Sequence, residues 1–384
     1  MTEDPKPLPG TVREVAGIFL RLGATAFGGP AAHIGLFRQE LVLRRAWVTD
    51  DEFLDLLGVT NMLPGPNSTE MAIHLGYVRA GWKGAIAGGV AFILPAALMV
   101  LVLAMLYVRV GTTPAATGLL YGVKPVIIAI VAYALYGLLG KALKNRALMA
   151  VGVGATTLYL LGVDETFLLF GLGLLYMTTT RLRAGQSPGA WLIFPVALPV
   201  SITASTVISL PLLFFTFLKI GAVLYGSGYV LLAFMRSDFV DTLGWLTNHQ
   251  LLDAVAVGQF TPGPLFTAAT FVGYLIGDKV GMGLLGAVLA TVGIFLPSFI
   301  FVLVSSRFIP RIRKSPVLSL MLDGVNAAAL GLMAGVTIEL GVSALIDPLT
   351  VILALASLAL LIRYKLNATW LILAGALIGL VISL

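Results

Sequence analysis

The stretch NMLPGPNSTE at residues 61–70 decides the fold of this chain, because two prolines and a glycine interrupt an otherwise apolar region. Proline has no backbone N–H to donate and its ring clashes with the preceding turn, so a continuous helix cannot pass through residues 64–66. The flanking segments, residues 50–61 and 67–80, are each shorter than the roughly 20 residues of a membrane-spanning helix. The stretch therefore predicts a re-entrant pair of half-helices that meet at the Pro-Gly-Pro break.

The motif returns at residues 262–264, and the surrounding sequence returns with it at a spacing of 198 residues. After a slip of four residues, Pro95 and Gly122-Val123 match Pro297 and Gly324-Val325 at a spacing of 202. The pairs at the first spacing include Arg21 with Lys219, Gly23 with Gly221, Phe27-Gly28 with Tyr225-Gly226, and Trp47 with Trp245. The chain therefore contains two copies of one unit.

We place the first copy at residues 11–183 and the second at residues 207–384. Residues 184–206 contain three prolines and are predicted to be an interfacial linker between the copies.

The composition is that of a membrane protein, with 59% hydrophobic and 11% charged residues and a mean hydropathy of +1.00. Too few polar groups are present to cover a globular surface. Long apolar runs without polar alternation favour helices over a β-barrel. These runs lie at residues 12–28, 84–107, 118–140, 147–162, 165–180, 207–227, 280–304, 318–341, 348–362 and 368–384. We therefore predict an all-α integral membrane protein with about ten transmembrane helices, five in each copy.

The distribution of basic residues predicts the orientation, because lysine and arginine mark the cytoplasmic ends of membrane helices. Basic residues crowd the loops at residues 141–146, 181–183, 307–314 and 363–365, which we place inside. The intervening loops carry Arg109 alone, the acidic pair at residues 164–165, and Asp347, and we place them outside. The helix after the first break then runs outwards and its counterpart runs inwards, so the two copies have inverted topology.

A second comparison agrees with this inversion. Residues 30–50 contain three arginines, Arg38, Arg44 and Arg45. The matching stretch, residues 228–248, contains Arg236 against two aspartates. The first stretch is therefore expected on the cytoplasmic side.

The breaks are the predicted binding site. Interrupted helices at matching places in two halves point to the substrate site of a transporter. A helix N-terminus carries about half a positive charge and unpaired N–H donors, so two such ends approaching from opposite faces suit an anion. The expected site residues are Gly28, Gly29, Asn61, Pro64, Gly65, Pro66, Asn67, Ser68, Thr69, Gly226, Gln259, Pro262, Gly263, Pro264 and Thr267.

Two matched basic residues, Arg21 and Lys219, lie within apolar sequence and are expected to contact the anion. A charge at membrane depth is costly, on the order of 3 kcal/mol, so it usually has a function. The alternative is that each reaches the interface or pairs with an acid such as Glu70 or Glu339.

Titratable residues near the first break are candidates for proton coupling. Glu70 and His74 are four residues apart on one helix face, and histidine titrates near neutral pH. The alternative is a hydrogen bond between them that holds the half-helix in place. Glu339 is a third candidate, and it is expected with Lys124, Asp323 and Asn326 to line a pathway. His33 is expected at the surface.

Other classes of function have little support. The chain has no cysteine, no Walker loop, no metal-ligand spacing and no nucleophile-base pattern, so we expect no enzyme, cofactor, metal or nucleic-acid partner. The polar start predicts no cleaved targeting segment. An anion channel would use the same inverted pair of half-helices and stays an alternative.

Several motifs together resemble one family. They are Phe27-Gly28-Gly29-Pro30, the step Arg45-Ala46-Trp47, and Pro-Gly-Pro in each half, spread over about residues 12–140 and 210–340. With these distances the chain resembles the chromate ion transporter (CHR) family in its long two-domain form. It differs at Asn61 and Glu70, where many members have glutamine.

The resemblance implies a prokaryotic inner-membrane carrier that exports chromate and confers chromate resistance. Sulfate is the chemically similar dianion, and its uptake or exchange is the alternative. The bilayer is the expected surrounding, and the oligomeric state, a homodimer included, is left open.

Overall fold

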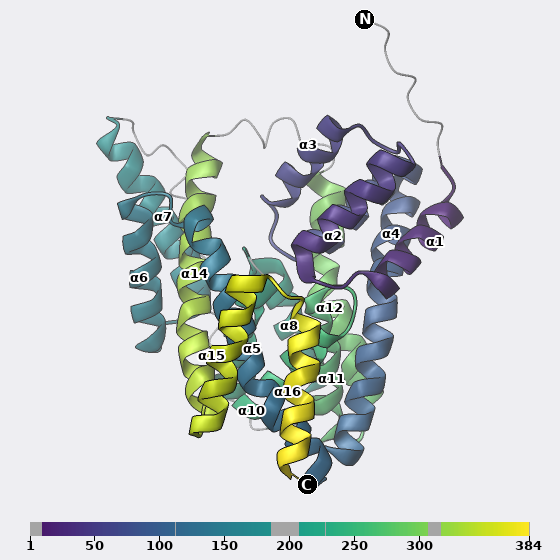
Figure 1. The fold of residues 1–384 in the computed structure, drawn as a ribbon. Helices are drawn as coiled ribbons and strands as arrows, with labels where there is room; N and C mark the ends of the chain where they lie inside the picture. The colour runs from purple at the N-terminus through teal and green to yellow at the C-terminus, as the bar shows by residue number, and fades with distance from the viewer. Residues whose placement is uncertain (1–9, 112, 186–206, 227, 306–315, 384) are drawn as a thin grey trace, which may run out of the picture. The chain divides into compact units, whose positions relative to one another are not determined.

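The structure, a computed structural model, describes residues 10–111, 113–185, 207–226, 228–305 and 316–383, and within them every regular element is helical (Figure 1). The basic loop at residues 307–314, and all but the first two residues of the predicted linker, lie outside the described residues. The elements are α1 (Val12–Thr25), α2 (Gly29–Phe37), η1 (Arg38–Arg44), α3 (Asp50–Thr60), α4 (Asn67–Val110), α5 (Pro114–Ala142), α6 (Arg146–Leu160), α7 (Glu165–Arg183), α8 (Leu210–Val223), η3 (Gly228–Val230), α9 (Leu231–Met235), η4 (Arg236–Thr242), α10 (Asn248–Phe260), η5 (Leu265–Thr267), α11 (Ala268–Asp278), α12 (Gly283–Ser305), α14 (Pro316–Ala344), α15 (Pro348–Tyr364) and α16 (Ala368–Ser383).

The chain forms two compact units, and each unit takes segments from both sequence halves. The first contains Met1–Met105, Leu213–Ala222 and Val257–Arg313. The second contains Leu106–Leu212, Val223–Ala256 and Lys314–Leu384. Both Pro-Gly-Pro breaks therefore belong to the first unit, although they come from different copies of the sequence repeat.

The core of the first unit begins on the apolar face of α1. Phe19 is fully buried there, and its ring lies edge-on to Phe37, Trp47 and Phe92, with centroids 5.5, 6.4 and 6.5 Å away. Such edge-on pairs suit the charge distribution of aromatic rings. The core therefore connects α1 to the segments on both sides of the first break.

A kink divides α4 where the predicted half-helix ends. Ala80 and Gly81 leave helical backbone geometry, with Gly81 at φ 63° and ψ −157°. Residues 67–79 thus form the predicted half-helix, and the long helix that follows begins after the kink. In the second copy α11 and α12 take these two places and pack against each other (Figure 1).

The second unit is organised around α5 and α14. Helix α5 packs against α14, α15 and α16, and α14 also packs against α6 and α7 (Figure 1). A Cβ on Gly122 would collide with the backbone of α16 at Gly375, so glycine permits this close approach.

Helix length and hydropathy support a membrane protein. Four of the described helical segments are long and apolar enough to cross a membrane, namely α4, α5, α12 and Val317–Ala344 of α14. Five shorter apolar helical segments accompany them, at Arg146–Leu160, Leu210–Val223, Leu265–Asp278, Pro348–Tyr364 and Ala368–Ser383. The number of ten spans stays a prediction.

Local structure repeats at the sequence spacing of 198. The segments η1 and η4 are both π-helices, and Gly28 and Gly226 both have positive φ, 104° and 93°. Thr49 and Glu52 exchange side-chain to backbone hydrogen bonds at the start of α3, and Thr247 and Gln250 do so before α10. The two copies therefore share local geometry as well as residue types.

One expectation was wrong. His33 is 1% exposed, and its Nε2 lies 3.1 Å from the Ala26 carbonyl oxygen. The apolar residues around it gave no local sign that α2 folds onto this turn. Burial lowers the pKa of His33 to about 4, so the ring is neutral at physiological pH.

Candidate functional site

The first break joins two half-helices through their polar ends. Helix α3 ends at Thr60 and α4 begins at Asn67, where the N–H groups of Thr69 and Glu70 donate to the Pro66 carbonyl at 2.8 and 3.0 Å. The Asn67 side-chain amide donates to the Asn61 side-chain oxygen at 2.7 Å. These two predicted site residues therefore connect the half-helices across the break.

Gly65 lies against a buried polar pair. The Ser298 hydroxyl, from α12, donates to Glu70 Oε1 at 3.3 Å, and both side chains are fully buried. A Cβ on Gly65 would lie 2.5 Å from the Ser298 Oγ and 2.5 Å from Glu70 Oε1, and its φ is 131°. Only glycine allows the backbone to approach this pair so closely.

Three polar atoms beside this break are buried without a hydrogen-bond partner. They are Thr69 Oγ1, Glu70 Oε2 and His74 Nε2, and all three side chains are at most 1% exposed. An unpartnered buried polar atom costs about 1–3 kcal/mol, and such atoms in a native protein call for a functional explanation. The carboxyl of Glu70 bonds to Ser298, so the predicted alternative of a Glu70–His74 hydrogen bond was wrong.

The second break packs in the same way but on apolar partners. The Gly263 N–H donates to the Ala26 carbonyl at 2.9 Å, and a Cβ on Gly263 would lie 2.7 Å from the Ala96 Cβ. The Thr267 hydroxyl donates to the Pro264 carbonyl at 2.8 Å. Each break therefore lies against the residue that follows the helix proline of the other copy.

The two breaks differ in charge. At the matching positions the second copy has Ala268 in place of Glu70, and the first copy has Ala96 in place of Ser298. The buried carboxyl and its hydroxyl partner thus occur at one break only.

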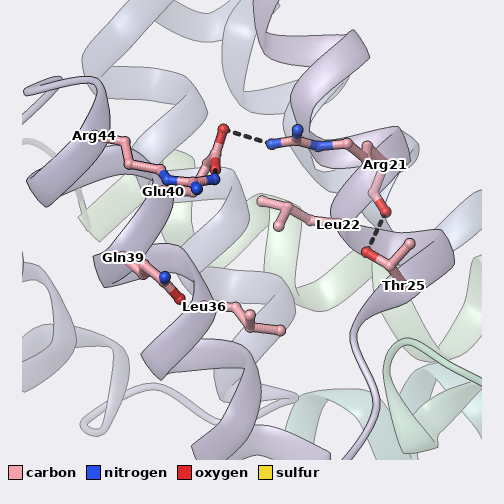
Figure 2. A pocket seen from close by; sticks show the side chains of 7 residues that line it. All are labelled: Arg21, Leu22, Thr25, Leu36, Gln39, Glu40 and Arg44. Carbon is pink, nitrogen blue, oxygen red and sulfur yellow. Dashed lines mark hydrogen bonds and ion pairs between the residues drawn. The ribbon is translucent and has the colours of Figure 1, made fainter.

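A pocket of about 250 Å³ lies beside α1 in the first unit, and Figure 2 shows Arg21 and Arg44 approaching Glu40 from different elements. The pocket is lined by Arg21, Leu22, Thr25, Leu36, Gln39, Glu40 and Arg44. Arg21 lies 2.5 Å from Glu40 Oε1, which confirms the alternative that Arg21 pairs with an acid, although the acid is neither Glu70 nor Glu339. The acid that does pair with Arg21 is 19 residues away, on η1.

Glu40 has three arginine partners. Arg45 and Arg44 lie 2.9 and 3.3 Å from its carboxylate, in addition to Arg21. The hydrogen bond from Arg45, and then those from Arg21 and Arg44, lower the pKa of Glu40 to about 2, against the smaller opposing effect of burial. Glu40 is therefore ionised at every physiological pH.

Most of the remaining predicted site residues also lie in the first unit. Lys219 is half-buried on α8, Gly28 and Gly29 precede and begin α2, and Gln259 lies near the end of α10. Gly226 and Glu339 belong to the second unit, where Glu339 pairs with Arg236 at 2.5 Å.

Sequence reasoning missed Glu40 and Ser298. A signal for Glu40 existed, because Asp238 stands 198 residues later and preserves the acid. Ser298 had no such signal, since its counterpart is Ala96.

Comparison with known proteins gives a consistent result. Residues 13–177 and 212–380 each match the family model described as chromate transporter. The chain is 36% identical over 381 residues to the chromate transport protein of Cupriavidus metallidurans, covering 97% of this chain and 93% of that protein. It is 31% identical to the probable chromate transport protein of Synechococcus elongatus, covering 93% and 91%. It is also 31% identical to the chromate transport protein of Pseudomonas aeruginosa, covering 98% and 94%. No solved structure matches this chain.

Proposed function

Because this chain belongs to the chromate transporter family, we propose that it exports chromate across the inner membrane of a prokaryote by alternating access. The observation that carries the proposal is the first break, where buried Thr69, Glu70 and His74 each keep an unpartnered polar atom beside a helix N-terminus. Sulfate, a dianion of similar shape, is the expected competitor.

The anion would bind through donors of the two breaks. The first N–H groups of a helix have no partner within that helix, and the positive end of its dipole favours negative charge. The Thr69 hydroxyl adds a donor, and the Thr267 hydroxyl at the matching position of the second break would donate to the anion in place of the Pro264 carbonyl. Both breaks belong to one compact unit, which supports a shared site.

Glu70 would link anion binding to a proton. An ionised carboxylate repels a dianion, whereas a protonated carboxyl can donate a hydrogen bond to it. Within the described residues the Glu70 carboxyl accepts a hydrogen bond from the Ser298 hydroxyl, a neutral group that does not compensate a buried negative charge fully. His74, one turn further along α4, would take part in the exchange of this proton.

Inverted repeats in a single carrier are supported by the direction of the helices in the first unit. Along α4, Ala85 packs in one cluster with Val302, and a Cβ on Gly89 would meet the ring of Phe299. The residue numbers of the contacting positions increase along α4, from 85 to 89, while they decrease along α12, from 302 to 299. These two matching helices therefore run antiparallel. We infer two copies of opposite orientation that rock against each other around the site.

Export needs no ATP. Moving one charge through 100 mV changes the free energy by about 2.3 kcal/mol, so a dianion leaving a cell with a negative interior gains about 4.6 kcal/mol. Uptake would require coupling to protons or to a counter-ion.

The test is an anion competition panel in proteoliposomes. Chromate flux is measured for wild type, Glu70→Gln, Ser298→Ala and Arg21→Ala, with sulfate, phosphate and chloride as competitors. We expect sulfate to compete best, Glu70→Gln to transport without dependence on a pH gradient, and Arg21→Ala to lose affinity. Asp164→Asn is the matched control, because it makes the same carboxyl-to-amide change at the cap of α7 in the other unit.

Chromate flux by wild type that does not respond to an imposed membrane potential would contradict electrogenic export. A Glu70→Gln protein that keeps the pH dependence of wild type would remove Glu70 from the coupling.

A further inference from the structure

Around the Glu40 pocket, defined by the seven lining residues named above, the positive charge exceeds what its carboxylate can neutralise. Three arginines share the single acid Glu40 at 2.5, 3.3 and 2.9 Å. A guanidinium offers about five N–H donors, whereas a carboxylate offers about four acceptor sites. One carboxylate therefore leaves donors of the three guanidiniums available.

The three arginine side chains are exposed, so a dissolved ion can reach their excess positive charge. The Glu40 side chain is 9% exposed, whereas those of Arg21, Arg44 and Arg45 are 53%, 66% and 39% exposed. The carboxylate is thus more buried than the guanidiniums of Arg21 and Arg44, which approach it from two sides (Figure 2).

The local fold explains how these groups meet. Glu40, Arg44 and the following Arg45 lie on or next to η1, a π-helix at Arg38–Arg44. In a π-helix the residue five positions on lies one turn away, so both basic residues return to the face that carries Glu40. Single π-helical turns of this kind are frequent at functional sites.

The matching positions of the other sequence copy do not carry the same positive charge. Lys219 and Asp238 preserve the cation of α1 and the acid, but Thr242 and Leu243 replace Arg44 and Arg45. The second π-helix, η4, is retained, so the difference lies in the side chains. Only one copy therefore has positive charge in excess of its acid.

We propose that the Glu40 pocket captures the divalent oxyanion before it enters the break. When no anion is bound, the Glu40 carboxylate pairs with the arginines in its place. The proposal rests on the proposed function. Arginine forks bind planar or tetrahedral oxyanions through paired hydrogen bonds, which makes a small dianion the ligand of matching chemistry. The pocket has room for such an ion with part of its hydration shell, since one water occupies about 30 Å³.

The capture pocket makes the carrier kinetically asymmetric by lowering the KM on one side, while the electrochemical gradient sets the direction of net flux. Residues 30–50 are predicted on the cytoplasmic side, and with inverted copies the matching stretch, which lacks counterparts of Arg44 and Arg45, faces outwards. A dianion is then concentrated at the inner entrance only, and it meets no arginine cluster where it is released.

The experiment compares variants of the full chain in proteoliposomes of determined orientation. Arg44→Gln/Arg45→Gln is expected to raise the KM for chromate on the cytoplasmic side by about tenfold or more, with kcat within about twofold. Lys141→Gln/Arg146→Gln, which removes two exposed charges from another predicted cytoplasmic loop, is the matched control and is expected to keep the wild-type KM. An unchanged KM in the first double variant overturns the proposal.

Arginines also orient membrane helices, so a second variant separates that effect from capture. Arg44→Lys/Arg45→Lys keeps the charge that orients the chain but loses the paired donors. It is expected to insert as wild type does and to show a KM between wild type and the glutamine variant. Two results together would overturn capture. The lysine variant would have the KM of wild type, and the glutamine variant would show a raised KM only where it is inserted in the wrong orientation.

Glu40 is tested by equilibrium binding. Glu40→Gln removes the internal competitor, so sulfate is expected to bind the purified protein about tenfold more tightly, as measured by isothermal titration at constant ionic strength. Weaker binding in a protein that unfolds at the wild-type temperature would overturn the competitor role. If wild type binds and transports neither chromate nor sulfate, the proposed function fails. If wild type transports normally and the variants keep its KM and its affinity for sulfate, only the capture pocket is rejected.

Discussion

Gly65 illustrates how one residue type permits the candidate site. Its φ of 131° is a conformation that residues with a Cβ rarely adopt, and its missing side chain leaves space for Glu70 and Ser298. The first break can therefore lie directly on the buried carboxyl, which places the backbone of the break beside the group proposed to carry the proton.

Gly65→Ala is expected to destabilise the protein by about 1–3 kcal/mol and to abolish most chromate flux, because backbone strain is added to a collision with two buried polar groups. Gly162→Ala is the control, since Gly162 also has a positive φ of 85° but nothing within 4 Å of its Cβ position. Thermal unfolding in detergent and flux in proteoliposomes measure the two effects. Equal flux in both variants would contradict the role of Gly65 in the site.

A largely buried charge pair lies in the second unit, between Lys124 and Asp253. Their charged atoms are 3.4 Å apart, and the Tyr107 hydroxyl donates to the other carboxylate oxygen at 2.8 Å. Asp253 is almost fully buried, so removal of its cation leaves an uncompensated charge.

Lys124→Met is expected to reduce the free energy of unfolding by about 3 kcal/mol, and Lys124→Met/Asp253→Asn is expected to recover most of that loss. Urea or thermal unfolding of the purified variants provides the comparison. If the double variant is as unstable as the single one, the pair does not act as a charge pair.

At the scale of the element, the interrupted helices depend on caps as much as on proline. Helix α3 starts with a capping box formed by Thr49 and Glu52, and the matching residues Thr247 and Gln250 make the same pair of hydrogen bonds before α10. These short half-helices have few hydrogen bonds of their own, so a cap contributes a large part of their local stability.

Thr49→Ala and Thr247→Ala are each expected to lower the free energy of unfolding by about 1 kcal/mol, because each leaves an N–H group at a helix start without its side-chain acceptor. Thr49→Ser and Thr247→Ser keep the hydroxyl and serve as controls. Unfolding measurements that found one cap neutral would mean that the two copies do not use their matching caps alike.

On the scale of the whole molecule, the compact units cut across the sequence halves. The first unit combines the start of the first copy with α8, α11 and α12 from the second, and so collects both breaks. A fold of this kind requires both copies, because neither half alone contains the helix against which its own break packs.

The absence of cysteine from the chain makes alternating access directly testable. Asn61→Cys and Gln259→Cys place one thiol next to each break, and a membrane-impermeant thiol reagent is applied to either side of oriented vesicles. We expect the two positions to react from opposite sides, and chromate to change their rates in opposite directions. Lys141→Cys, at an exposed position in the last turn of α5, is the control that should react equally with and without chromate. Reaction of both break positions from the same side in every condition would contradict the mechanism.

The sequence by itself determined the helical membrane class, the internal repeat, and the places where helices stop. These features follow from local rules: proline removes an N–H group, glycine alone accepts positive φ, and apolar runs require lipid or a protein interior. The half-helix predicted at residues 67–80 ends at the kink at residues 80–81, and the family was indicated by the combination of motifs in the two halves.

Only the tertiary structure decided which charged and polar groups meet. Glu40 rather than Glu70 or Glu339 pairs with Arg21, and Ser298 reaches Glu70 from 228 residues away. Such contacts depend on which helices pack together, and packing energy is the sum of many small apolar contacts distributed over the whole chain. No short motif encodes that sum, so the partners of the breaks became visible only in the folded molecule.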